Sequence, residues 1–367
     1  MSRNYKHEDV TKELRNASSE LKPLLAHLRT TFPYGPKVEL DFGTFANVVD
    51  VLGIKIAFSI DGVGSKVMIC ELMSQYQFIG IDCVAMNVND ILCVGAKPLS
   101  MLDYISTEVI NEDTLNQIGK GLADGAKQAE INIIGGELAF LPDLLKGETS
   151  KGAIDLAGTC IGTLIFEDPI IGKQIQPGDK IIGLESSGLH SNGFTMVRKV
   201  FGLLPETSLK TKQSILDKYH SDLGQTLGQE LLVPTKIYVK QILSMLQSIE
   251  VHGLCHITGD GLLNLPRLSS DVGYIIDSPP DPNPIFKMIA EHGAIPPSSM
   301  YEAFNMGIGF CVVVPSSEVQ HVMDIASAHQ TKATQIGYIT EDSEKKVLLP
   351  TLGLTGRRGQ GFRATHI

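Results

Sequence analysis

The stretch Ile60-Asp61-Gly62-Val63-Gly64-Ser65-Lys66 follows an apolar, β-branched run that predicts a strand from Lys55 to Ile60. Its two glycines let a polyphosphate approach the backbone, Lys66 can meet the phosphate charge, and Asp61 can hold a divalent cation. The stretch lacks the Gly-x4-Gly-Lys-Ser/Thr pattern of a Walker A loop, and Val67 stands where a Rossmann fingerprint needs its third glycine. It therefore argues against a P-loop or dinucleotide fold. An ordinary turn is the alternative interpretation.

Length and composition set the broad class of the protein. The 367 residues favour two domains. The net charge of −10 argues against a dedicated nucleic-acid binder, and no apolar run is long enough for a membrane helix. The N-terminus is polar where a signal peptide would be apolar, so we expect a cytoplasmic protein. The six cysteines form no Cys-x-x-Cys pair and are expected to be reduced core thiols.

Alternating short apolar runs and amphipathic segments predict an α/β protein. We expect an N-terminal arm at 1–36 with an amphipathic helix, α/β domains at 37–168 and 169–345, and a mobile tail at 346–367 that carries Arg357, Arg358 and Arg363. Helices are predicted near 80–94, 111–129, 191–202, within 212–247 and within 317–340, and strands near 55–60, 98–104, 131–134, 155–166, 180–184, 273–276 and 308–314. Asn111 is the expected cap of the second helix.

Two further motifs carry carboxylates. In Asn87-Val88-Asn89-Asp90, Asn87 and Asp90 are three residues apart and share one face of the predicted helix. Asn and Asp are unfavourable inside helices, so either they have a function or they form a solvated face. Gly135-Gly136-Glu137 follows the strand predicted at 131–134, where a carboxylate could bind metal, although such a turn is common.

A cluster of hydroxyls and glycines, Ser186-Ser187-Gly188-Leu189-His190-Ser191-Asn192-Gly193, opens a predicted helix. Free N–H groups and hydroxyls at a helix start form a cradle for anions. His190 could donate to the ligand or exchange a proton with it, and the positive end of the helix should keep it neutral. The alternative is a capping turn with an exposed histidine. A nucleophilic serine is not indicated, because no Gly-x-Ser-x-Gly elbow is present.

The segment from Val251 to Gly261 contains His252, Cys255 and His256. A zinc site is not expected, because Gly253 interrupts any helix and no fourth ligand is indicated. Its end, Thr258-Gly259-Asp260-Gly261, is another loop that a ligand could approach closely.

Together, and in this order, these motifs resemble the aminoimidazole ribonucleotide synthetase family, also called phosphoribosylformylglycinamidine cyclo-ligase. The resemblance covers about residues 37–340 and includes these further segments: Gly80-Ile81-Asp82, Val94-Gly95-Ala96-Lys97-Pro98, Asp103-Tyr104, Asp155-Leu156-Ala157-Gly158, Pro234-Thr235-Lys236-Ile237-Tyr238-Val239 and Met300-Tyr301-Glu302-Ala303-Phe304-Asn305-Met306-Gly307. Single motifs are shared with thiamine-monophosphate kinase and selenophosphate synthetase. The Ser-Ser-Gly-x-His-Ser-Asn-Gly and Met-Tyr-x-x-Phe-Asn-x-Gly patterns point to the cyclo-ligase.

The resemblance implies a two-domain, ATP-binding synthetase-like α/β fold that forms a homodimer through the sheets of the N-terminal domains. It also implies Mg²⁺ and ATP, and a ribonucleotide substrate, with no nucleic-acid or membrane partner. In the family, the formyl oxygen of formylglycinamidine ribonucleotide is phosphorylated and the amidine nitrogen then closes the imidazole ring, a step of de novo purine biosynthesis.

Matched motif by motif, the resemblance assigns four sets of residues. The catalytic set is His190, Lys66 and Asp90. The ATP and phosphate set is Asp61, Gly62, Gly64, Ser65, Lys66, Asn87, Asn89, Gly135 and Gly136. The substrate set is Ser187, His190, Ser191, Asn192 and Thr258. The metal set is Asp61, Asp90 and Glu137, with Asp260 as a further candidate.

The chain departs from the family pattern at four places. The N-terminal segment Tyr5–Lys12 lacks a glycine, and Leu138 and Phe140 stand where the family usually has a threonine and a polar residue. Asp260 replaces a glycine, and the resemblance assigns no role to the 353–367 tail. A divergent ATP-dependent phosphotransferase resembling thiamine-monophosphate kinase is therefore an alternative. A non-catalytic nucleotide-binding dimer is another, although such a copy should have lost one of Asp61, Asp90 and Glu137.

Overall fold

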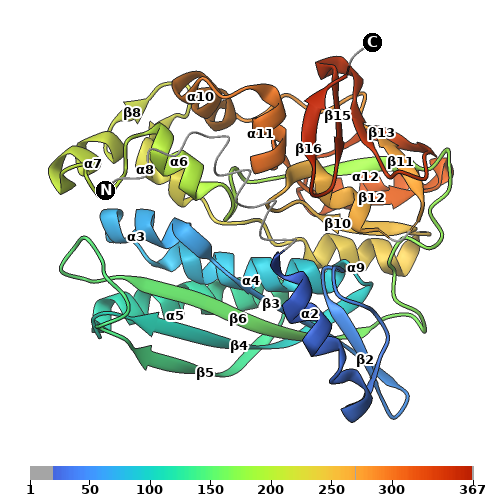
Figure 1. Cartoon of the computed structure of the whole chain (residues 1–367), viewed down its shortest axis with the longest axis horizontal. Helices are drawn as coiled ribbons and strands as arrows, with labels where there is room; N and C mark the ends of the chain where they lie inside the picture. The colour runs from blue at the N-terminus through green and yellow to red at the C-terminus, as the bar shows by residue number, and fades with distance from the viewer. Residues whose placement is uncertain (1–19, 269, 366–367) are drawn as a thin grey trace.

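The computed structural model describes residues 20–268 and 270–365. These residues form a six-stranded sheet in the N-terminal half, an eight-stranded sheet in the C-terminal half and a small two-stranded sheet (Figure 1). Helices pack against both large sheets, which confirms the expected α/β class.

The N-terminal sheet ends at Leu164 and the C-terminal one begins at Lys180. In spatial order, the N-terminal sheet contains β1 (Lys37–Val38), β2 (Asn47–Val51), β3 (Ile54–Gly62), β6 (Ile154–Leu164), β4 (Ala96–Thr107) and β5 (Asn132–Phe140). Only β4 and β5 run parallel among these neighbours, and α5 (Glu112–Ala129) connects them. The side chain of Asn111 accepts a hydrogen bond from the Thr114 N–H at 3.0 Å, which confirms the predicted cap.

Helix α4 (Gln77–Leu92) lies between this sheet and the C-terminal half (Figure 1). It packs closely against α5, because a Cβ at Gly121 would collide with the Gln77 carbonyl. Covered on both sides, α4 buries Asn87, Asn89 and Asp90. The solvated-face interpretation of these polar residues is therefore wrong.

The C-terminal sheet is antiparallel except where β11 runs beside β14. Its order is β10 (Gly253–His256), β12 (Ile308–Val314), β7 (Lys180–Glu185), β13 (Ala333–Glu341), β11 (Val272–Ile275), β14 (Val347–Leu349), β15 (Leu354–Arg357) and β16 (Gly361–Ala364). The small sheet pairs β8 (Tyr219–His220) with β9 (Gln225–Thr226).

The remaining α-helices are α2 (Lys22–Arg29), α3 (Val67–Met73), α6 (Phe194–Val200), α7 (Leu209–Leu216), α8 (Leu227–Leu232), α9 (Val239–Ser248), α10 (Pro284–Gly293), α11 (Pro297–Ala303) and α12 (Val319–Ala328). Short 3-10 helices are η1 (Phe32–Tyr34), η2 (Gly64–Lys66), η3 (Gly261–Arg267), η4 (Ser316–Glu318) and η5 (Pro350–Leu352).

The interpretation of residues 346–367 as a tail is wrong where the structure describes them, up to residue 365. Strands β14, β15 and β16 extend the C-terminal sheet, and Leu354 and Phe362 are buried in its core. Burial of these two side chains offsets the entropy of ordering a glycine-rich segment.

The arm is seen only from residue 20, and the expected helix upstream lies outside the described residues. Its visible helix α2 buries no side chain and is tied to the body by two hydrogen bonds of 2.8 Å from Arg29 to Asp41.

All six cysteines are free and buried, as expected for core thiols. In the described part of the chain, no helix is both long and apolar enough to span a bilayer.

Candidate functional site

Asp61 lies near the end of β3, and Asn87 of α4 fixes the backbone around it. The Asn87 amide accepts from the Asp61 N–H at 3.0 Å and donates to the Asp61 carbonyl at 3.2 Å and the Cys83 carbonyl at 2.9 Å. These bonds occupy the buried Asn87 amide. Asn87, expected to contact ATP, therefore positions Asp61 instead.

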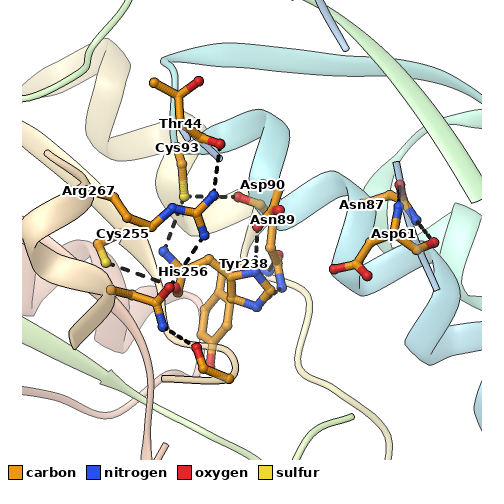
Figure 2. Close-up of polar contacts among 12 residues, drawn as sticks. Thr44, Asp61, Asn87, Asn89, Asp90, Cys93, Tyr238, Cys255, His256 and Arg267 are labelled. Carbon is orange, nitrogen blue, oxygen red and sulfur yellow. Dashed lines mark hydrogen bonds and ion pairs between the residues drawn. The ribbon is translucent and has the colours of Figure 1, made fainter. Parts of the chain in front are cut away.

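Asp90 makes its main contact with a residue of the other domain (Figure 2). Its Oδ1 lies 2.9 Å from Nδ1 of the fully buried His256, and Asn89 Nδ2 lies 3.4 Å from His256 Nε2. Because an amide N–H only donates, Nε2 accepts and Nδ1–H points to Asp90. Asn89 also binds the Lys236 carbonyl and the Tyr238 N–H, so both of its amide groups join the two domains.

The two carboxylates of α4 and β3 interact electrostatically. Burial, followed by the charge of Asp90, raises the pKa of Asp61 to about 6. Arg267 and His256 act in the opposite direction. The site therefore holds two acids whose charges repel each other, and a bound cation would relieve that repulsion.

The surroundings of Lys66 do not fit the phosphate contact that the sequence predicts. Its ammonium is fully buried, forms a 2.7 Å ion pair with Asp82, and donates to the carbonyls of His190 at 3.2 Å and Val233 at 2.7 Å. Asp82 in turn accepts from the backbone and side chain of Thr235, both at 2.7 Å. Lys66 thus joins the first domain to the His190 loop of the second.

The Ser186–Gly193 loop precedes α6 as expected, but His190 is buried, so the alternative with an exposed histidine is wrong. Its Nε2 accepts from the Ser187 N–H at 3.3 Å, which places the proton of a neutral ring on Nδ1. That Nδ1 is buried and has no hydrogen-bond partner among the described residues. Burial lowers the pKa of His190 well below its usual value, so burial is the main cause of the neutrality that we had ascribed to the helix dipole.

Of the other residues of the loop, Ser187 and Ser191 contact the Pro234–Thr235 segment, and Asn192 lies near a second loop. The Ser187 hydroxyl donates to the Pro234 carbonyl at 2.6 Å, and the Ser191 hydroxyl lies 3.3 Å from that of Thr235. Asn192 lies beside the Thr258–Gly261 loop, since its Oδ1 is 3.6 Å from the Cβ position of Gly259. Thr258 is half-buried on the same loop, and Asp260 occupies the left-handed region at φ 73°.

Asn305, from the second cyclo-ligase-like pattern, holds this loop in place. Its Oδ1 accepts from the Ser186 hydroxyl at 3.0 Å and from the Gly307 N–H, and its Nδ2 donates to the Gly188 carbonyl at 2.8 Å. The two sequence patterns that point to the cyclo-ligase are therefore parts of one hydrogen-bonded unit.

Gly62, Gly64 and Ser65 lie where β3 passes into η2, and the Ser65 hydroxyl lies 3.3 Å from that of Thr195 in α6. Gly64 has a φ of 68°, which a glycine adopts readily.

Gly135, Gly136 and Glu137 lie within β5 and not after a strand, because β5 continues to Phe140. Glu137 pairs with the exposed Tyr104, so its side chain lies on the sheet face opposite α4. Within one chain, Glu137 therefore does not join Asp61 and Asp90 in a metal site. No cluster of three or more His, Cys, Asp or Glu suited to a metal occurs in the described ranges.

Sequence reasoning missed two important residues. His256 was considered only for zinc, although its position one residue before Ile257-Thr258 placed it near a ligand loop. Arg267 had no sequence signal; it donates to the carbonyls of Gly43 at 3.2 Å and Thr44 at 2.8 Å from the end of η3 (Figure 2).

Two family models cover most of the chain. The AIR synthase related protein N-terminal domain matches residues 43–164, and the corresponding C-terminal domain matches residues 176–349. The chain belongs to the AIR synthase family. This confirms the resemblance seen in the sequence and the expected two-domain fold.

Curated relatives named phosphoribosylformylglycinamidine cyclo-ligase include those of Methanococcus maripaludis strain C7 and Methanocaldococcus jannaschii. The first is 43% identical over 302 residues, 82% of each chain, and the second is 40% identical over 341 residues, 92% of this chain and 93% of that one.

Solved structures of other enzymes resemble this chain in fold. Thiamine-monophosphate kinase from Stenotrophomonas maltophilia K279a has a TM-score of 0.60 at 20% identity and covers 89% of this chain and 95% of that chain. T. maritima PurL complexed with FGAR has a TM-score of 0.55 at 16% identity and covers 88% of this chain and 47% of that chain.

Proposed function

We propose that this protein is an ATP-dependent cyclo-ligase that converts formylglycinamidine ribonucleotide to aminoimidazole ribonucleotide in purine biosynthesis. The observation that carries the proposal is the 40–43% identity to relatives of that name over both domains. The kinase alternative is not favoured, because the kinase similarity is confined to the fold at 20% identity or less.

The chemistry occurs in two steps. The formyl oxygen attacks the γ-phosphorus of ATP and releases ADP; the amidine nitrogen then attacks the activated formyl carbon, and that carbon loses the oxygen as inorganic phosphate. The nitrogen gives up a proton as the ring closes. Such transfer requires positioning and charge neutralisation more than covalent help from the protein.

The acidic pair suits a magnesium ion. Asp61 and Asp90 would hold it, because a cation offsets both the burial of Asp61 and the repulsion from Asp90, which together raise the pKa of Asp61. Magnesium is usually bound by one or two carboxylates together with substrate phosphates, which fits a site with no larger ligand cluster among the described residues. When bound, the ion would neutralise charge on the phosphates of ATP.

The remaining residues orient and protect the reactants. The His256 bond fixes the Asp90 carboxylate, and the Asn87 amide fixes the backbone of Asp61. His190 offers an Nδ1–H that no described residue occupies, so it can donate to the ribonucleotide without adding a permanent positive charge.

We predict that magnesium binding weakens as pH falls through about 6, because protonation of Asp61 removes one of its two charges. The ion-free protein should show the opposite trend. Its folded state holds the Asp61 proton more tightly than the unfolded chain, so stability decreases as pH rises from about 3.8 to about 6.

Calorimetric titration with magnesium-ATP between pH 5 and 8 checks this prediction. Asp61→Asn should bind more weakly and lose the pH dependence near 6, whereas Asp271→Asn, at an exposed acid, should behave as the wild type. A pH-independent affinity in the wild type would exclude Asp61 as a ligand.

An assay of ADP release tests the proposed activity. Formylglycinamidine ribonucleotide, thiamine monophosphate and selenide are supplied separately with magnesium-ATP, and the products are identified by mass spectrometry. We expect ADP and aminoimidazole ribonucleotide with the first substrate alone. ADP release with thiamine monophosphate instead would favour the phosphotransferase alternative.

We further propose that the enzyme works as a cytoplasmic homodimer. The sheet face opposite α4 exposes Phe58, Ile60, Leu102 and Tyr104 on β3 and β4, on either side of β6. A contiguous apolar face of this kind is typical of a protein interface. A second copy of the same face would cover it.

Sedimentation velocity at micromolar concentration should therefore give about twice the 39.7 kDa chain mass. Ile60→Lys, in the centre of the face, should shift the species to monomer. Leu52→Lys, which changes an even more exposed apolar residue at the β2–β3 turn, should remain dimeric. A wild type at monomer mass would refute the proposal.

A further inference from the structure

The C-terminal hairpin β15–β16 lies beyond the stretch that the family models match, which ends at residue 349. It is nevertheless built into the molecule: Leu354 and Phe362 are buried, and Gly356 packs against the side chain of Leu263 in η3. Helix η3 follows the Thr258–Asp260 loop and carries Arg267 at its end. The hairpin is therefore docked on the element that borders the candidate site.

The turn of this hairpin places Arg358 near Gly43, in the backbone segment to which Arg267 also donates hydrogen bonds. Residues 358–360 connect the strands, with Gly359 at φ 77°. Arg358 Nη1 lies 3.9 Å from the Cβ position of Gly43, whose carbonyl accepts from Arg267 Nε at 3.2 Å. Two guanidinium groups thus converge on one turn of the first domain.

Within residues 20–268 and 270–365, no close ion pair balances the charges at this point. Arg267 donates hydrogen bonds to carbonyl and amide oxygens and stacks its guanidinium on the Phe45 ring at 3.8 Å, and no carboxylate of the described residues lies within ion-pair distance of either arginine. Crowding by surrounding residues and then the charge of Arg267 lower the pKa of Arg358, although part of its side chain stays exposed to solvent; the charge of Asp260 opposes this effect. By contrast, the neighbouring Arg357 forms an ion pair with Glu344.

Two cations near the same segment repel each other, and an anion bound between them would relieve this repulsion. Planar guanidinium groups suit phosphate oxygens, which accept two parallel hydrogen bonds. Arg358 remains exposed, so a ligand can reach it. Arg267 also acts electrostatically on Asp61, so an anion bound here would lie within electrostatic range of that acid.

We propose that Arg358, together with Arg267, binds a phosphate group of a substrate at the edge of the active site. Arg358 is then a binding residue of the C-terminal hairpin, which lies outside the segments that the two family models match. This inference rests on the proposed function for the identity of the substrates, which offer two sources of phosphate: the triphosphate of ATP and the 5′-phosphate of the ribonucleotide.

The test compares Arg358→Gln with Arg358→Lys and with Arg363→Gln, which removes the same charge from an exposed position on the same hairpin. Steady-state kinetics on the full chain should show KM for one substrate raised about tenfold or more in Arg358→Gln, with kcat changed less than twofold. Arg358→Lys should recover part of the loss because it keeps the charge, and Arg363→Gln should match the wild type. The substrate whose KM rises identifies the phosphate.

An unchanged KM for both substrates would overturn the proposal. A similar rise in both KM values with a lower kcat and a lower melting temperature would also overturn it. That pattern indicates a structural role. Calorimetric titration with ribose 5-phosphate and, separately, with magnesium-ATP needs no turnover. If the wild type failed to close the ring but Arg358→Gln still bound one of these probes about tenfold more weakly, the proposed function would fall and the phosphate site would stand.

Discussion

His190→Ala is expected to reduce kcat/KM for the ribonucleotide by one to three powers of ten, about 1.4 to 4 kcal/mol, while magnesium-ATP affinity stays nearly constant. The reason is the buried Nδ1–H of His190, which has no partner among the described residues and would gain one in the bound substrate. Measurement of kcat and KM for each substrate, with calorimetry for magnesium-ATP, checks both parts.

Two further substitutions separate the roles of the ring nitrogens. His190→Asn keeps a donor near the Nδ1 position and tolerates the left-handed backbone of this residue, at φ 61°. It should retain more activity than His190→Gln, which extends its amide toward the Nε2 position. The exposed His321→Ala serves as the control. Loss of ATP binding with intact ribonucleotide affinity in His190→Ala would reverse the assignment of Ser187, Ser191 and Asn192 as well.

Lys66→Met is expected to lower the free energy of unfolding by about 3 to 5 kcal/mol, the usual cost of removing one partner of a buried ion pair. The substitution strands the buried carboxylate of Asp82 and removes the donor that Lys66 provides to the carbonyls of His190 and Val233. Urea unfolding of the wild type and the variant measures this loss.

A matched surface pair provides the control for Lys66. Lys37 forms a 2.9 Å ion pair with Glu39 but is 74% exposed, so Lys37→Met should leave the free energy of unfolding nearly unchanged. The double variant Lys66→Met/Asp82→Leu should regain part of the stability, because no unpaired charge remains. If Lys66→Met instead kept its stability and raised only the KM for ATP, the phosphate contact expected from the sequence would be right.

The sequence identified the elements that depend on local pattern. The period of α5 and its Asn111 cap were readable, because capping and the apolar stripe involve residues within a few positions of one another. The alternation around β3 likewise predicted the strand that carries Asp61.

Contacts between residues far apart in the chain could not be predicted from the sequence. Nothing near Lys66 indicates that Asp82 faces it, and the approach of Asp90 to His256 spans 166 positions of the chain. Glu137 was misplaced because the glycines at 135 and 136 suggested a turn, whereas pairing with β4 carries the strand through them. The sequence predicts a tail at 354–364 because glycines and arginines dominate the segment, and only Leu354 and Phe362 supply the side chains that anchor the hairpin.

The central claim is that the formyl oxygen is phosphorylated before the ring closes, and an oxygen-18 transfer experiment tests it most directly. Formylglycinamidine ribonucleotide labelled at the formyl oxygen is turned over with unlabelled magnesium-ATP, and the released inorganic phosphate is analysed by mass spectrometry. The account predicts one labelled oxygen in the phosphate for each aminoimidazole ribonucleotide formed. Released phosphate without the label would contradict it.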